Sequence, residues 1–229
     1  MKRTIVLFVI LIFSVFGCDK KSQKNNYLSK EDTPKGAVES SGLGVEKPKE
    51  TATTPGPFQS LAVYTDKGSR DNHFIPSGFM PDGKCLTLDD AWVQDCHSGK
   101  ACIKITYDVT CSKQGAKWAG IYWQNPANNW GNRKGGFDLT GATRLTFWAK
   151  GENGGERIEE FKLGGISGDY PDSDSAIMGP VILTKEWKEY SIDLRGKDLS
   201  YVSGGFAWST NVDVNPESCI FYLDDIKYE

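Results

Sequence analysis

Apolar and polar residues alternate in many short stretches of the chain beyond residue 57. The ranges 103–108, 145–150 and 190–194 place apolar side chains at every second position, which is the period of a half-buried β-strand. Further short apolar runs lie between clusters of Gly, Pro, Asn and Asp, and they are 61–64, 118–124, 161–163, 181–183, 206–209 and 219–228. Only 86–94 and 197–202 have room for a turn of helix. The pattern predicts an all-β domain, a jelly-roll β-sandwich of about ten short strands.

The composition agrees with this fold class. The 229 residues include 25 glycines, and aromatic residues make up 12% of the chain, as expected for strands joined by many turns. The predicted strands fall within residues 58–229, which is about the size of one sandwich domain. The formal net charge is −3, and charges of both signs are mixed along the chain. The sequence contains no basic stripe, which argues against a nucleic-acid partner.

The first residues are typical of an export signal. Lys2 and Arg3 precede an apolar run, Ile5–Phe13, whose nine residues are too few to span a bilayer. The run leads to Gly17-Cys18, which resembles the bacterial lipobox, where a cysteine is lipidated and becomes the mature N-terminus. This resemblance implies a signal peptide at 1–17 and a membrane anchor through Cys18, since two or more acyl chains hold a protein stably at a bilayer. The alternative is an ordinary cleaved signal.

Residues 18–57 are predicted to be a tether. This segment is rich in Pro, Gly, Ser and Thr, has mixed charges, and contains a single aromatic residue, Tyr27. It cannot bury enough apolar surface to offset the loss of chain entropy, so we expect it to be disordered. The predicted location is the bacterial cell envelope, with the outer membrane or cell surface favoured. Asp19 resembles an inner-membrane retention signal, so the inner membrane stays an alternative.

Export places the cysteines in an oxidising compartment. Besides Cys18, the sequence has five cysteines, and they are Cys85, Cys96, Cys102, Cys111 and Cys219. An odd number allows at most two disulfides and leaves one thiol over, and the sequence does not decide the pairing. Metal ligation by these cysteines is disfavoured, because no C-x-x-C motif is present and the chain has only two histidines.

Three stretches of the C-terminal half resemble a known family. They are GGFDLTGATRLTFWAKG, TKEWKEYSIDL and the terminal FYLDDIKYE. Together they are similar to strand motifs of jelly-roll carbohydrate-binding modules of the galactose-binding-domain-like superfamily. The resemblance covers 135–229 and implies the jelly-roll fold. It implies no particular ligand, because this fold hosts sugar binders, other adhesive modules and accessory domains.

The stretch 118–130 is the candidate binding site. In a strand, Trp118, Gly120, Tyr122 and Gln124 share one face, while the other face suits the core. Aromatic side chains stack on the apolar faces of sugar rings, and amides bond hydroxyl groups as donor and acceptor. The predicted ligand-binding residues are therefore Trp118, Tyr122, Gln124, Asn129, Trp130 and Trp208. The alternative is that Trp118 and Trp130 merely cover the edge of the sheet.

Two other tryptophans are interpreted differently. Trp148 alternates with the core positions of its strand, and Trp187 belongs to the E-W-K-E-Y motif. For both we expect packing against the protein's own chain. Trp208 alternates with Ala207 and Ser209 in the same way, and an outward-facing Trp208 would add a platform for a sugar ring.

Acidic residues near the two ends of the domain form a candidate metal site. Jelly-roll modules of this kind often carry a structural calcium that joins the first strand to the last. The resemblance implies that Asp224 and Asp225, with Asp66 after the first strand, would supply the carboxylate oxygens that calcium prefers. The alternative is a pair of solvated acids. The alternating acids of 169–174 lack full EF-hand spacing, so a solvated turn is expected there.

Catalysis finds little support in the sequence. His73 and His97 are the only histidines, and there is no G-x-S-x-G elbow for a nucleophilic serine. A glycine-rich loop that would cradle phosphate before a helix is also missing, so no organic cofactor is expected. The acids lie mostly in loops, and no pair stands out as the two carboxylates of a glycosidase.

These observations predict a lipid-anchored, non-catalytic module that binds polysaccharide or glycan. The alternative is a surface lipoprotein that acts as an adhesin or envelope structural protein and binds protein partners. A small glycoside hydrolase is the weaker alternative. The ligand and the oligomeric state are left open by the sequence.

Overall fold

The computed structural model describes residues 57–229. The signal peptide predicted at 1–17, the lipidation site Cys18 with Asp19, and the tether up to residue 56 lie outside the described residues. The strands are β1 (Leu61–Tyr64), β2 (Ile75–Pro81), β3 (Leu86–Trp92), β4 (Cys102–Tyr107), β5 (Trp118–Gln124), β6 (Arg144–Gly151), β7 (Arg157–Ile158), β8 (Glu160–Gly164), β9 (Ser175–Met178), β10 (Val181–Ile182), β11 (Lys188–Asp193), β12 (Gly204–Asn211) and β13 (Cys219–Tyr228). A 3₁₀ turn, η1 (Gly83–Cys85), and a short helix, α1 (Val109–Ser112), complete the elements.

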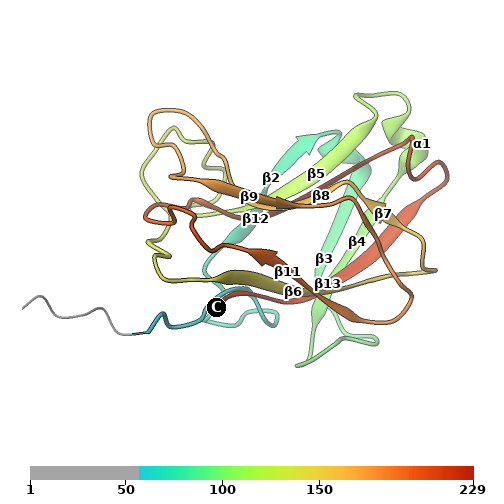
Figure 1. The fold of residues 1–229 in the computed structure, drawn as a ribbon. Helices are drawn as coiled ribbons and strands as arrows, with labels where there is room; N and C mark the ends of the chain where they lie inside the picture. Colours follow the sequence, from blue (N-terminus) through green and yellow to red (C-terminus); the bar gives the residue numbers. More distant parts are fainter. Residues whose placement is uncertain (1–56) are drawn as a thin grey trace, which may run out of the picture. The chain divides into compact units, whose positions relative to one another are not determined.

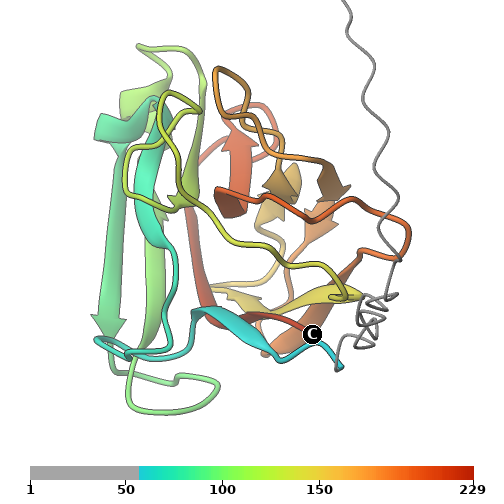
Figure 2. The same cartoon turned by 90° about the vertical axis from the view of Figure 1, so that its left-hand side faces the viewer.

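Two antiparallel sheets form the predicted β-sandwich (Figure 1). The first sheet has the order β11-β6-β13-β4-β3, and β1 pairs with the end of β13. The second sheet has the order β2-β5-β12-β8-β9, and β7 and β10 form a separate small pair. Figure 2 shows β1, in cyan, beside the chain end marked C, in agreement with the pairing of Leu61 with Tyr228. Apart from the consecutive pairs β3–β4 and β8–β9, neighbouring strands of the two sheets are not consecutive in the sequence, as expected for a jelly roll.

The core lies between the two sheets. The side chains that face inwards from β6 are Leu145, Phe147 and Ala149, and they are fully buried. Phe147 packs on Phe161 of β8 and Phe206 of β12, with ring centroids 4.6 and 5.2 Å apart. These contacts join the two sheets. The apolar residues that alternate along 145–150 in the sequence are thus the ones that face the core.

Neither of the two ranges expected to have room for a helical turn contains a helix, and 197–202 is irregular apart from the bridge of Val202 to Phe137. The range 86–94 was expected to have room for a helical turn, but Leu86–Trp92 is strand β3, which pairs with β4. Leu86 and Leu88 alternate with polar residues and face the core, so sheet pairing decides the conformation. The only α-helix in residues 57–229 is instead α1, where the Asp108 carboxylate accepts a hydrogen bond from the Cys111 N–H at 3.0 Å and caps the helix start.

The five cysteines within residues 57–229 form two disulfides, Cys85–Cys111 and Cys96–Cys102, and leave Cys219 as a free, buried thiol. This agrees with the expected count and settles the pairing that the sequence left open. Burial raises the pKa of Cys219 to about 12, so the thiol stays protonated and unreactive in the folded state.

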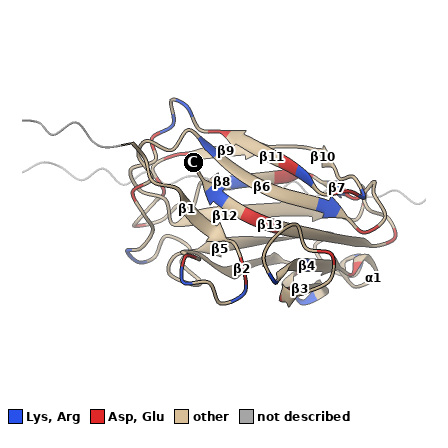
Figure 3. Ribbon diagram, turned by 90° about the horizontal axis from the view of Figure 1, so that it is seen from below, with Lys and Arg blue, Asp and Glu red and all other residues tan. Residues whose placement is uncertain are grey.

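In the part of the chain that the structure describes, no helix is long and apolar enough to cross a membrane. Seen from the side of the first sheet, acidic and basic positions are interspersed along the strands (Figure 3). This distribution matches the mixed charge pattern of the sequence.

Candidate functional site

The candidate site is the outer face of the second sheet, called the open face below. It carries the side chains of β5 that point away from the core. Trp118 is 40% exposed at the start of β5, and Trp130 is 45% exposed in the loop that follows the strand. Trp118 and Tyr122 are four residues apart on one face, so their Cα atoms are about 14 Å apart along the strand. The two exposed tryptophans thus mark a span longer than a single sugar ring.

Trp130 rests on Tyr122. The two rings meet edge to face, with centroids 5.8 Å apart. Trp130 also covers Gly78 of β2, where a Cβ atom would come within 2.9 Å of its ring. Tyr122 is only 5% exposed, and its hydroxyl donates a hydrogen bond to the Gly164 carbonyl at 2.9 Å. Tyr122 is therefore the floor under Trp130, and little of its own surface is left for a ligand.

Gln124 and Asn129 are fully buried and shape the loop that carries Trp130. The Gln124 amide donates to the Asn129 carbonyl at 2.9 Å and accepts from the Ser77 hydroxyl at 3.0 Å. The Asn129 side chain accepts from the Gly131 N–H at 3.1 Å. The prediction that these two amides contact a ligand is wrong for this conformation, because local backbone and side-chain groups already use them and they do not reach solvent.

Trp208 is a further correction. It is fully buried, and its ring packs edge to face on Phe221 of the first sheet at 4.8 Å. On β12 the larger residues Phe206 and Trp208 face the core, and the small residues Ala207 and Ser209 face outwards. Alternation alone does not say which set is inside, and here the size of the indole favours the core. Trp208 cannot be a platform for sugar.

Several residues of the open face were not predicted from the sequence. They are half-buried side chains on other strands of the same sheet, and they are Met80 on β2, Ser209 and Asn211 on β12, and Glu160 and Lys162 on β8. Ser209 and Asn211 pair in register with Gly120 and Trp118. Lys162 lies over the Tyr122 ring, with its Nζ 5.3 Å from the centroid. Their alternation with core residues was visible in the sequence, but which strands lie beside β5 was not.

The three predicted metal residues do not gather at one point. Asp224 and Asp225 lie together with His97, with ligand atoms within 4.8 Å of one another, and Asp66 is outside this group. A bulge in β13 and a left-handed φ of 47° at Asp225 turn both carboxylates to the same side. Successive residues of a regular strand would point to opposite faces.

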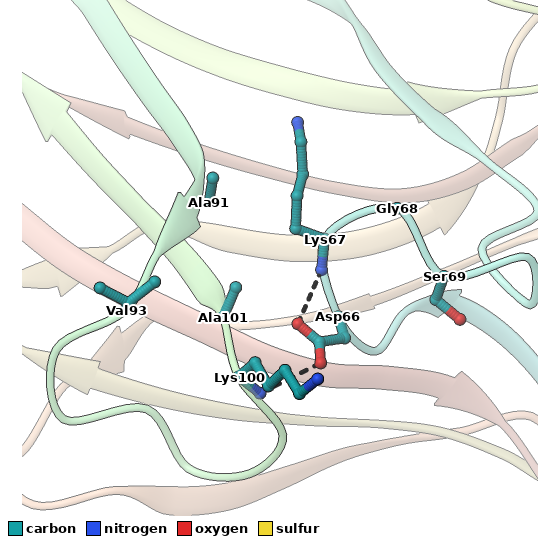
Figure 4. A pocket seen from close by; sticks show the side chains of 8 residues that line it. All are labelled: Asp66, Lys67, Gly68, Ser69, Ala91, Val93, Lys100 and Ala101. Carbon is teal, nitrogen blue, oxygen red and sulfur yellow. Dashed lines mark hydrogen bonds between the residues drawn. The ribbon is translucent and has the colours of Figure 1, made fainter.

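All three carboxylates hold the residues 93–101, called the strap below. Asp224 accepts from the Ser98 N–H at 3.1 Å, and Asp225 pairs with His97 at 2.9 Å. Asp66 accepts from the backbone N–H groups of Lys67 and Lys100, at 2.9 and 3.0 Å (Figure 4). Asp66 also lines an open cavity of about 510 Å³ between the strap and the loop after β1.

This donor set suits calcium poorly. Calcium is held by six to eight oxygen ligands, whereas His97 offers nitrogen and the carboxylate oxygens already accept hydrogen bonds from the strap. The structural calcium stays a prediction. Asp66 does not support it, because this carboxylate lies outside the group formed by Asp224, Asp225 and His97.

The strap covers the outer face of the first sheet, called the covered face below. As predicted, Trp148 and Trp187 pack against the protein's own chain. His97 stacks on Trp148 with centroids 3.7 Å apart, and the Trp187 indole N–H donates to the Asp95 carbonyl at 2.8 Å. The Cys96–Cys102 disulfide closes the strap at its base. The aromatic side chains of this face are thus partners of the strap.

Neither a family model nor a curated protein matches the sequence. The solved structures that are similar include a family 30 carbohydrate-binding module of a cellulosomal cellulase from Clostridium thermocellum, with 16% identity over 75% of this chain and 97% of that chain and a TM-score of 0.47.

A family 11 module of a cellulosomal cellulase from the same organism has 12% identity over 76% of this chain and 95% of that chain, with a TM-score of 0.47. A variant family 29 module complexed with mannohexaose has 10% identity over 76% of this chain and 92% of that chain, with a TM-score of 0.44. At these identities and TM-scores the similarities do not extend to the ligand or the site.

Proposed function

We propose that this chain is a non-catalytic carbohydrate-binding protein that binds polysaccharide or glycan on the open face. The observation that carries the proposal is the pair of exposed tryptophans, Trp118 and Trp130, on one side of one sheet. Removing the exposed surface of these two indoles from water is favourable. A sugar ring has a flat apolar face that can stack on an indole.

Polar side chains border the two indoles. Ser209 and Asn211 lie beside Trp118, and Lys162 lies across Tyr122 from Trp130. Hydroxyl, amide and ammonium groups can bond the sugar hydroxyls at the rim of the stacked ring. Trp118 lies on a paired strand and Trp130 lies next to it, so little conformational entropy of the protein should be lost on binding. Each site should still have modest affinity, because hydrogen bonds to solvent-exposed sugar hydroxyls contribute little binding free energy.

The proposal includes attachment to the bacterial envelope through a lipid on Cys18. It rests on the sequence of residues 1–18 alone, where an apolar run ends at Gly17-Cys18. Mass spectrometry of the membrane fraction tests it. A lipid-modified Cys18 at the mature N-terminus is expected, and an unmodified mature chain that begins at another residue would contradict it.

The test of glycan binding uses the full chain and a panel of polysaccharides, with affinity electrophoresis as the measurement. Trp130→Ala and Trp118→Ala should each weaken binding at least tenfold, since each indole is expected to contribute more than about 1.4 kcal/mol. Phe79→Ala is the matched control, because Phe79 is 43% exposed but lies on the other side of strand β2 from Met80.

A second candidate is an adhesin that binds a protein partner. The observation that favours it is the shape of the open face, since Trp118, Tyr122 and Trp130 line none of the four cavities described in residues 57–229. If no polysaccharide binds while Trp118→Ala and Trp130→Ala abolish binding to a protein of the extracellular matrix, this second function replaces the first.

A further inference from the structure

Lys162 of β8 lies over an aromatic ring of the open face. Its ammonium group lies 5.3 Å from the centroid of the Tyr122 ring, and Trp130 packs on another side of the same ring. The side chain is half-buried. Among residues 57–229 it forms neither an ion pair nor a hydrogen bond. A partly desolvated cation without an anionic partner is unfavourable, unless a ligand supplies that partner.

The nearby acids Glu160 and Asp172 form no ion pair with Lys162. Its partners in register are Ala207 on β12 and Ile177 on β9. Glu160 lies on the same side of the strand but outside ion-pair distance. Asp172 is the other nearby acid, and its two oxygens already accept hydrogen bonds from Ser203, Gly204 and Ile166. The ammonium group is therefore free to bind an external carboxylate.

Lys150 of the covered face also lies among aromatic rings. Lys150 lies 4.9 Å from the ring centroid of Tyr222 and 5.4 Å from that of Trp187. There the strap places the Asp95 carboxylate on the ammonium group. The strap thus supplies a carboxylate to Lys150, whereas Lys104 of the same face lies over the Trp92 and Tyr222 rings without an ion-pair partner in the described chain. On the open face no segment of the described chain plays that part.

Two more cations follow Trp130 in its loop. The Arg133 guanidinium donates to the Ala127 carbonyl, and the Lys134 ammonium lies 6.0 Å from the centroid of the Tyr170 ring. Neither has an ion-pair partner in the described chain. Positive charge in the loop that carries an exposed indole favours a ligand that combines a ring face with an anion.

Building on the proposed function, we infer that the glycan is a polyuronate and that Lys162 is the residue that selects it. A sugar ring stacked on Trp130 would direct its carboxylate to the ammonium group over Tyr122. The carboxylate would take the place that Asp95 takes on the covered face.

The experiment compares polygalacturonate with its methyl ester, which keeps the ring and removes the charge. The full chain should bind polygalacturonate more tightly than the ester, and added salt should reduce the difference. Lys162→Gln should weaken binding to polygalacturonate about fivefold and leave binding to the ester unchanged. Lys104→Gln is the matched control, because Lys104 also lies over an aromatic ring, Trp92 at 4.0 Å, but belongs to the covered face.

The results separate the two proposals. If neutral glycans bind through Trp130 and Lys162→Gln changes no affinity, the inference about polyuronates is overturned and the glycan-binding function stands. If no glycan of either kind binds, the proposed function fails, and the inference fails with it. A loss of binding in Lys104→Gln equal to that in Lys162→Gln would also overturn the role of Lys162.

Discussion

The two outer faces of the sandwich carry the same kinds of residue but differ in what covers these residues. The covered face and the open face each carry tryptophan, tyrosine and lysine on paired strands. On the covered face the strap stacks His97 on Trp148 and pairs Asp95 with Lys150. On the open face Trp130 stays 45% exposed and Lys162 lacks an acidic partner in the described chain. An aromatic face is therefore packed against the protein's own chain or left exposed to solvent according to what covers it.

The first test of this comparison exchanges one tryptophan of each face for alanine. Trp148→Ala should lower the free energy of unfolding by about 3 kcal/mol, because it removes the ring on which His97 stacks and leaves a gap under the strap. Trp130→Ala should lower it by less than about 1 kcal/mol, since much of this side chain already faces water. Urea denaturation measures both values. Equal losses would mean that the two faces do not differ in the way proposed.

The second test releases the strap at its base. The double substitution Cys96→Ser and Cys102→Ser removes a crosslink of six residues' separation. The loss of this crosslink should cost about 2 kcal/mol of stability, as estimated from the entropy of closing so short a loop. Thermal denaturation gives the change in stability. Glycan binding should persist in this variant, and its loss would show that the open face depends on the strap.

The third test uses pH. Burial, together with the adjacent charge of Asp225, raises the pKa of Asp224 to about 6. A carboxyl whose pKa is higher in the folded than in the unfolded state binds its proton more tightly when folded. The Asp224 carboxyl therefore adds to the free energy of unfolding at low pH, and this addition is lost as the pH rises from about 4 through about 6.

Asp224→Asn removes this titration. Relative to the unsubstituted chain, the variant should therefore gain stability as the pH rises over that interval. Urea denaturation of both proteins at several pH values measures the difference. A difference that is constant with pH would show that Asp224 does not titrate as described. Asp193→Asn on the exposed strand β11 is a control, because the pKa of Asp193 is lowered to about 2, mainly by the hydrogen bond from Arg195, and lies below this interval.

The smallest expected effect concerns calcium. Because Asp66, Asp224 and Asp225 already accept hydrogen bonds from the strap or its flanks, addition of calcium or of a chelator should leave the melting temperature unchanged. Differential scanning fluorimetry in both conditions is the measurement. A clear rise with calcium, absent from Asp225→Asn, would restore the metal site that the family resemblance implied.

The alternation of apolar and polar residues predicted the sandwich because it depends only on the geometry of a single strand. The alternation at 103–108 and 145–150 appears in β4 and β6, since a period of two sets which side chains share a face. The range 86–94 was misread because its conformation depends on pairing with β4, which sequence proximity does not reveal. Trp208 was misplaced for a related reason, because alternation identifies two faces without saying which one is buried.

The amides of the candidate site show the same limit. Gln124 and Asn129 have the chemistry of sugar ligands, but the loop after β5 folds back and uses both of them itself. Lys162 was not singled out, because its position over Tyr122 arises from strand β8, which is about forty residues away in the sequence. The signal that could have found it was an outward-facing lysine between two core residues, Phe161 and Leu163.

By itself, the sequence determined the all-β fold class and the number of disulfides that the cysteines allow. These follow from composition, from the period of two and from an odd count of cysteines. The tertiary structure decided which aromatic face stays in contact with solvent and which acids meet His97. The reason is that exposure and charge pairing depend on segments far apart in the chain, and the strap shows how nine residues can close one face while Trp118 and Trp130 remain open on the other.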